Sequence, residues 1–186
     1  MRHLTKEELE AGLDAIRQAP ANEGVLRLIV RRPKVNTREV LDVGELDLSD
    51  GLVGDSWKTR RDYRTPDGSP CLDAQLTLMN ARAIALVAQE PQYWPLAGDQ
   101  LYVDLDLSVA NLPPGTQLAI GGAVIQITGT PHTGCKKFAA RFGQDAVRFV
   151  NSVEGKRLRL RGVNARVVQP GEIHVGCMVK KHPPSV

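Results

Sequence analysis

Short stretches in which apolar and polar residues alternate, separated by glycine- and proline-containing turns, most restrict how this chain can fold. Residues 101–107 alternate throughout, with aspartates between apolar neighbours, and residues 40–48 follow the same period. Residues 117–120 and 123–127 flank a Gly-Gly pair, which is the pattern of a tight hairpin. A period of two places successive side chains on opposite faces, so these stretches are predicted to be strands.

Other short segments are predicted to be strands because they are rich in β-branched residues and bounded by turn residues. They are residues 25–30, 74–78, 158–160, 163–168 and 173–179. Many short strands with a few interrupting helices are typical of a mainly β, α+β domain with a barrel-like sheet. A chain of 186 residues can bury a sufficient core for such a domain without disulfides.

A few helices are expected at the periphery. Thr5 and Glu8 have the spacing of a capping box at the start of a short N-terminal helix, which Pro20 ends. Asn80 is placed to cap a second helix, and Gly143 to separate two more. These three helices are predicted over residues 81–88, 136–142 and 145–153. We expect a helical extension over residues 1–22, a barrel domain over 23–180 and a tail over 181–186.

The charge and the aromatic content bear on the class of partner. The formal net charge is +3, and aromatic residues make up 4% of the chain. Few aromatic side chains are available to stack on bases, and there is no polybasic run, so a nucleic-acid partner is not expected. A mildly basic protein is compatible with an anionic ligand.

The cysteines and the apolar segments bear on the compartment. Cys71, Cys135 and Cys177 are odd in number and widely spaced, which is a poor framework for disulfides and favours a reducing compartment. The N-terminal segment lacks the apolar core of a signal peptide, and no apolar run is long enough to span a bilayer. We therefore expect a cytoplasmic protein without a membrane partner.

Residues 128–138 contain the strongest indication of chemistry. A strand is predicted to end, a tight turn to follow, and a helix to begin near Cys135. The positive end of that helix, Lys136 with Lys137, and His132 if protonated would all favour the thiolate form of Cys135. A thiolate attacks electrophiles, carries sulfur or binds a soft metal. The alternative is that Cys135 is a small buried apolar residue, which is the commoner state of an unpaired cysteine.

A zinc site is a second alternative. His132 and Cys135 have a His-x-x-Cys spacing, and His174 and Cys177 repeat it. Two such pairs have the donor set of a tetrahedral Cys2His2 zinc site, provided that all four side chains meet. Nothing in the sequence brings the two pairs together, and we expect that they do not converge.

Five segments resemble motifs of the MOSC family, named for the C-terminal domain of molybdenum-cofactor sulfurase, and they occur in that family's order. They are a Gly-Asp turn at residues 51–55, a strand at 74–79, the run into Gly-x-x-Leu-x-Ile-Gly at 111–121, a cysteine-bearing turn at 131–135 and an Arg-Gly strand at 161–167. The sequence departs from the family at residues 97–103, in place of a glycine-rich motif, and at residues 175–177, where Val-Gly-Cys replaces Val-Gly-Asp.

The resemblance implies a MOSC-like β-barrel with a few peripheral helices and a role with sulfur or the molybdenum cofactor (molybdopterin). Cys135 matches the family's cysteine, and its implied roles are catalytic residue, molybdenum ligand or persulfide carrier. Because the pterin carries a phosphate, basic groups are expected around it. The candidates for that role are Arg60, Arg61, His132, Lys136, Lys137 and Arg161.

The family also suggests an enzymatic class and partners. A molybdenum-cofactor-dependent reductase would need an electron-donor protein, and a sulfurtransferase would need a sulfur-donor protein. The alternatives are a cofactor-binding module without turnover and a β-barrel with the structural zinc site described above.

Overall fold

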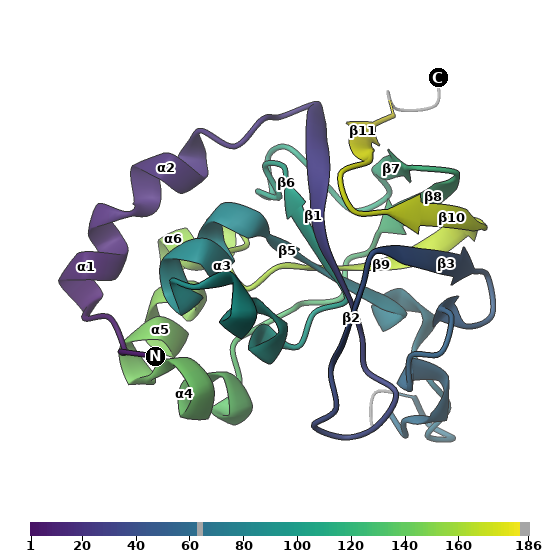
Figure 1. Ribbon diagram of the computed structural model, residues 1–186, viewed down its shortest axis with the longest axis horizontal. Coiled ribbons are helices and arrows are strands. Elements are labelled where there is room, and N and C mark those ends of the chain that lie inside the picture. The colour runs from purple at the N-terminus through teal and green to yellow at the C-terminus, as the bar shows by residue number, and fades with distance from the viewer. Residues whose placement is uncertain (63–64, 183–186) are drawn as a thin grey trace.

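The computed structural model describes residues 1–62 and 65–182, and within them seven strands close into a β-barrel (Figure 1). Round the barrel the order is β1, β11, β7, β8, β9, β5 and β6, and pairing of β11 with β1 closes it. The neighbours pair antiparallel except β5 and β6, which are parallel. The bounds are β1 Glu23–Arg31, β5 Leu76–Asn80, β6 Leu101–Asp104, β7 Gln117–Ile120, β8 Ala123–Ile127, β9 Val163–Gln169 and β11 Met178–Lys181. The predicted barrel fold is confirmed.

A second, smaller sheet lies beside the barrel. It consists of β3 (Val43–Asp47), β4 (Gly51–Leu52) and β10 (Gly171–His174), in the order β10, β3, β4. The short strand β2 (Glu39–Leu41) pairs with the end of β1. The alternating stretch at residues 40–48 is therefore divided between two sheets.

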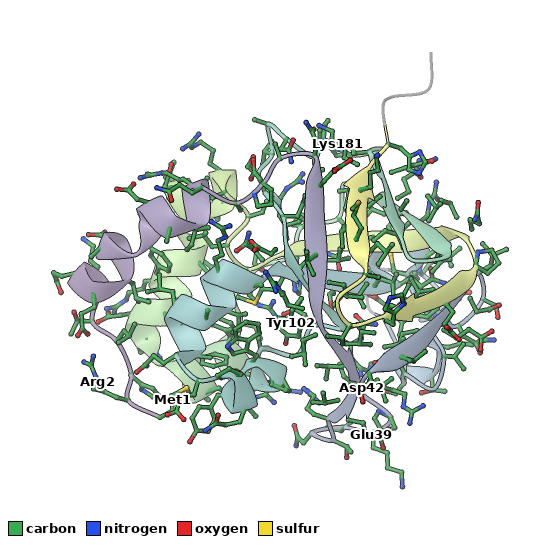
Figure 2. All side chains as sticks on the ribbon, turned by 45° about the horizontal axis from the view of Figure 1, so that its top comes forward. Met1, Arg2, Glu39, Asp42, Tyr102 and Lys181 are labelled. Carbon is green, nitrogen blue, oxygen red and sulfur yellow. The ribbon has the colours of Figure 1, made fainter. Side chains whose placement is uncertain are left out.

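The helices gather on one side of the barrel (Figure 1). They are α1 Lys6–Ala11, α2 Leu13–Arg17, α3 Ala81–Ala88, α4 Lys136–Phe142, α5 Gln144–Asn151 and α6 Val153–Arg157, together with the 3-10 segment η3 Pro91–Ala97. Two further 3-10 segments, η1 Trp57–Thr59 and η2 Leu72–Ala74, lie outside this group. Tyr102 of β6 is fully buried in the layer between barrel and helices (Figure 2), and its hydroxyl donates to the carbonyl of Trp94 at 2.8 Å. No helix in the described part of the chain is both long and apolar enough to traverse a bilayer.

The local signals in the sequence correspond to the observed element ends. Thr5 and Glu8 form the capping box of α1, and the Asn80 side chain accepts from the backbone N–H of Ala83 to cap α3. Gly143, at φ 94°, separates α4 from α5 as predicted. Within the expected C-terminal tail, residues 183–186 lie outside the described residues.

Three strand predictions need correction. Residues 173–179 do not form one strand, because a turn at residues 175–177 separates β10 from β11. Residues 158–160 do not form a strand, because hydrogen bonds from Leu158 to Glu154 and from Leu160 to Gly155 continue the end of α6. Strand β6 ends at Asp104 instead of continuing to residue 107. The Asp106 carboxylate accepts from the N–H of Ser108 at 2.8 Å and turns the chain out of the sheet.

The buried cap of α3 supports a first prediction. Asn80 is 2% exposed; its Oδ1 accepts from the Ala83 N–H at 2.9 Å, and its Nδ2 donates to the Leu105 carbonyl at 2.7 Å. Replacing Asn80 with alanine removes the cap and leaves a buried carbonyl unpaired, so the free energy of unfolding should fall by about 2–4 kcal/mol. Urea denaturation measures it. Thr5→Ala, which removes the exposed cap of α1, is the matched control and should cost less; equal losses would contradict the prediction.

Candidate functional site

Two adjoining cavities meet at His132 and form one cleft beside the barrel. The Arg161 cavity, of about 410 Å³, is lined by residues that include Thr133, Asn151, Lys156, Arg159 and Arg161. The Arg60 cavity, of about 290 Å³, is lined by residues that include Arg32, Trp57, Arg60 and Arg61. Pro131, His132 and Asn164 line both. The turn between β8 and α4 therefore forms the wall that the two cavities share.

A buried carboxylate holds His132 in place. Asp99, which follows η3 and is fully buried, has its Oδ1 2.7 Å from Nε2 of His132. Its Oδ2 accepts from Nη1 of Arg161 at 2.6 Å. Arg161 also donates to the Ala97 carbonyl at 3.0 Å and stacks over the Phe138 ring at 5.1 Å from its centroid. These contacts orient the histidine from the protein side of the cleft.

The electrostatics of this cluster set its protonation. Burial opposes ionisation of Asp99, but the charge of Arg161 and the contacts of His132 outweigh it and hold the Asp99 pKa well below its ordinary value. Burial, and next the positive charge of Arg161, lower the pKa of His132, and Asp99 offsets only part of this. His132 is therefore neutral at neutral pH, so the positive charge that a protonated His132 would have supplied to Cys135 is not present.

A second buried ion pair braces the Arg60 cavity. Arg32 donates from Nε to Asp55 Oδ2 at 2.8 Å and from Nη2 to Oδ1 at 3.0 Å, and its Nη1 reaches the Gly98 carbonyl at 2.7 Å. Asp55 also accepts from the N–H of Trp57 at 2.9 Å. Two buried arginines thus contact the segment 97–99, Arg32 through Gly98 and Arg161 through Ala97 and Asp99.

The predicted basic residues separate into two groups. Arg60, Arg61 and His132 share the Arg60 cavity, and Arg161 lies with His132 in the other. Lys136 and Lys137 are exposed at the start of α4, outside the described linings of both cavities. The cavity linings therefore bring together four of the six predicted residues and leave out the two lysines, and the role of all six stays a prediction.

Sequence reasoning missed Arg32 and Asp99. Asp99 stands in the segment 97–103 that departs from the family's glycine-rich motif, and that departure was the one available signal. Arg32 precedes a proline in an otherwise unremarkable stretch. Arg32 pairs with Asp55, 23 residues along the chain, and Asp99 pairs with Arg161, 62 residues along the chain. Pairings between residues this far apart are not visible in the sequence.

Cys135 is exposed at the N-cap of α4. The preceding Gly134 is fixed by Asn151, which accepts from its N–H at 2.8 Å and donates to its carbonyl at 3.0 Å. Thr133 lines the Arg161 cavity, whereas Cys135 is outside the described linings of both cavities, and no hydrogen bond joins it to His132 among the described residues. Cys135 thus follows the cleft wall along the chain and faces solvent.

The exposure of the three thiols predicts their order of alkylation. Cys135 is exposed, Cys71 is intermediate, and Cys177, in the turn between β10 and β11, is 6% exposed. Under native conditions iodoacetamide should label Cys135 first and Cys177 last, since reagent access requires exposure. Peptide mass spectrometry over time measures the order. Labelling of Cys71 as fast as Cys135 would contradict this prediction, and labelling in urea, where all three thiols are accessible, is the control.

The zinc arrangement is not formed. Within residues 1–62 and 65–182, no three His, Cys, Asp or Glu side chains are grouped so that they could hold a metal ion. His132, Cys135, His174 and Cys177 all lie within this part, so the two His-x-x-Cys pairs do not converge, as expected.

The family model described as "MOSC domain" matches residues 71–180, which is more than half of the chain. The chain belongs to the MOSC domain family. The match includes Asp99, His132, Cys135 and Arg161, whereas Arg60 and Arg61 precede it. A MOSC domain therefore contributes the Asp99 cluster, which consists of Asp99, His132 and Arg161, and most of the cleft.

Solved structures show the same fold. The YuaD protein from Bacillus subtilis is 18% identical, with a TM-score of 0.63, covering 88% of this chain and 97% of that one. YiiM from Escherichia coli is also 18% identical, with a TM-score of 0.53, covering 87% of this chain and 71% of that one. No curated protein sequence matches the chain. At this identity the likeness establishes the fold of this MOSC protein.

Proposed function

We propose that this MOSC protein binds the anionic molybdenum cofactor in the cleft around His132 and uses Cys135 as its sulfur-bearing group. The observation that carries the proposal is the juxtaposition of Arg60, Arg61 and His132 in one cavity. The Arg161 cavity, at about 410 Å³, lies within the range of small-molecule sites, roughly 300–1,000 Å³, and the Arg60 cavity, at about 290 Å³, lies just below its lower limit. The donor set and the size of the cleft thus fit a phosphorylated pterin.

Arg60 and Arg61 would hold the phosphate. Nε and Nη2 of Arg60 donate to the Ser56 hydroxyl at 3.0 and 2.7 Å, which directs the guanidinium along η1. Burial, and next the like charge of Arg32, lower the pKa of Arg60. An arginine crowded by another arginine is stabilised when an anion arrives, because the anion offsets their repulsion. The phosphate role is therefore assigned to this cavity.

Asn164 and His132 would orient the rest of the cofactor. Asn164 donates from Nδ2 to the carbonyls of Thr130 and Pro131 at 3.0 and 3.2 Å, which fixes the shared wall of the two cavities. When bound, the cofactor supplies a redox-active metal that accepts a thiolate ligand. The cytoplasm, where thiols stay reduced, is the proposed compartment for such a site.

The position of Cys135 favours persulfide carriage as a second candidate role. An exposed thiol outside the cavity linings is accessible to a donor protein. The Cys135 thiolate would attack the terminal sulfur of a persulfide on that donor, forming a new S–S bond while the donor's own S–S bond breaks. The donor departs as a thiolate, and no external oxidant or reductant is needed.

Metal and sulfur analysis of the full chain tests the proposal. Protein purified from cells supplied with molybdate should contain molybdenum, and Arg60→Gln/Arg61→Gln should lose at least about tenfold, the effect of removing two charge-assisted contacts. Arg148→Gln, an exposed arginine of α5, is the matched control. If the wild type contains neither molybdenum nor persulfide, or the double variant retains its molybdenum, the proposal is wrong.

Cys135→Ser then separates the two roles of the thiol. A molybdenum ligand predicts that the variant loses molybdenum. A carrier predicts that molybdenum stays while the persulfide, detected by mass spectrometry of the intact chain, disappears. Retention of both molybdenum and persulfide in Cys135→Ser would exclude either role.

A further inference from the structure

We propose that Asp99 is a positioning residue that holds His132 as its Nε2–H tautomer, so that Nδ1 accepts a hydrogen bond from the ligand of the cleft. The ligand class that follows is one with an N–H or O–H donor next to an anionic group. The inference deepens the proposed function and rests on it in treating the cleft as a ligand site.

The contacts of the imidazole ring define which atom is free. Nε2 faces Asp99 at 2.7 Å, and Cδ2 packs on Gly162, where an added Cβ would lie 3.2 Å from it. In a five-membered ring, Nδ1 is the vertex opposite the Nε2–Cδ2 bond. The edge that contacts the protein interior therefore directs Nδ1 away from it.

Nδ1 is also accessible. Among the buried side-chain nitrogen and oxygen atoms of the described residues, Trp94 Nε1 and Arg161 Nε are the two without a partner. His132 contacts a hydrogen-bonding partner in that part of the chain through Nε2 alone. Nδ1 has no such partner, and it is not one of the two unpartnered buried atoms. It is therefore accessible to solvent and contributes to the 17% exposure of the His132 side chain.

The charges around His132 determine that Nδ1 accepts. The Asp99 carboxylate, ionised beside Arg161, can only accept, so the proton of the contact resides on Nε2. A second proton on Nδ1 would charge a ring that is largely shielded from water, and the positive charges of Arg161 and Arg32 also oppose it. The neutral ring then presents a lone pair between two cavities whose charged side chains include Arg60, Arg61, Lys156 and Arg159. Asp62 also lines the Arg60 cavity.

Nitrogen NMR of the full chain tests the tautomer without any ligand. Long-range proton–nitrogen spectra should show His132 with a protonated Nε2 and an unprotonated Nδ1 at pH 7. In Asp99→Asn the His132 pattern should shift toward a mixture of tautomers, while exposed His174, the internal control, keeps its signals. A protonated Nδ1 in the wild type, or an unchanged His132 pattern in a folded Asp99→Asn, would overturn the inference.

Binding of two probes tests the ligand class. Pterin-6-carboxylate has ring N–H donors and an anionic group, whereas sulfate has acceptors alone. His132→Leu should weaken the pterin about three- to tenfold, the effect of one hydrogen bond, and leave sulfate unchanged. His132→Gln, whose amide oxygen can accept, should recover part of the loss, and His174→Leu should alter neither probe.

The outcomes distinguish the two proposals. If the wild type fails to bind pterin-6-carboxylate, the proposed function is overturned, while the tautomer spectra still decide the role of Asp99. If the wild type binds it and His132→Leu binds it equally well, or loses both probes equally, the assignment of Nδ1 as the ligand's acceptor is wrong.

Discussion

Replacing Asp99 with alanine is expected to lower the free energy of unfolding by about 3–5 kcal/mol, because it leaves the buried charge of Arg161 without compensation. Asp99 is 0% exposed and Arg161 6%, so water cannot take the place of the carboxylate. Oδ1 of Asp99 also contacts Nε2 of His132 at 2.7 Å, and the alanine variant loses that contact too. Urea denaturation followed by fluorescence measures the change.

Two further variants identify the cause. Asp99→Ala/Arg161→Met removes both charges and should recover much of the loss, since an apolar pair of similar volume is often tolerated in a buried site. Asp14→Ala removes the partner of Arg17 in an exposed pair and should leave the unfolding midpoint nearly unchanged. A loss below about 1 kcal/mol in Asp99→Ala would show that solvent reaches Arg161 after all.

Gly162→Ala is the second substitution with a large expected effect, roughly 2–6 kcal/mol of unfolding free energy. Gly162 has φ of +108°, in the region that favours glycine, and an added Cβ would overlap the backbone carbonyl of Leu78 in β5. Because the obstacle is backbone, relief requires β9 to move away from β5 inside the barrel. The same movement displaces Arg161 and the Cδ2 contact of His132, so ligand binding should fall as well.

Gly115→Ala is the matched control. Gly115 has φ of +93°, but an added Cβ would have no atom within 4 Å. The Gly115→Ala variant therefore has the backbone strain of a non-glycine residue at positive φ, about 1–3 kcal/mol, without the steric overlap. The difference between the two variants, measured by urea denaturation, isolates the contact with Leu78. If both variants lose the same free energy, the close approach of β5 and β9 at Gly162 has no energetic cost.

The sequence by itself determined the elements whose ends depend on neighbouring residues. The capping box of Thr5 and Glu8 and the Asn80 cap act over three residues, and the hairpin of β7 and β8 turns within Gly-Gly. Such interactions are specified by local spacing, so their residue types are sufficient to predict them. The MOSC fold was predicted differently, through the resemblance of the ordered motifs around Cys135 to that family.

Tertiary structure alone decided the secondary structure of short apolar runs and the composition of the cleft. Residues 158–160 have the composition of a strand but form the hydrogen-bonded turn that follows α6, because a short apolar run does not by itself specify one state and packing selects it. The Asp99 cluster joins residues 33 and 62 positions apart, and its strength comes from burial that the folded barrel creates. Charge pairing depends on distance and on the exclusion of water, and both are properties of the closed barrel with its covering helices rather than of any segment of the chain.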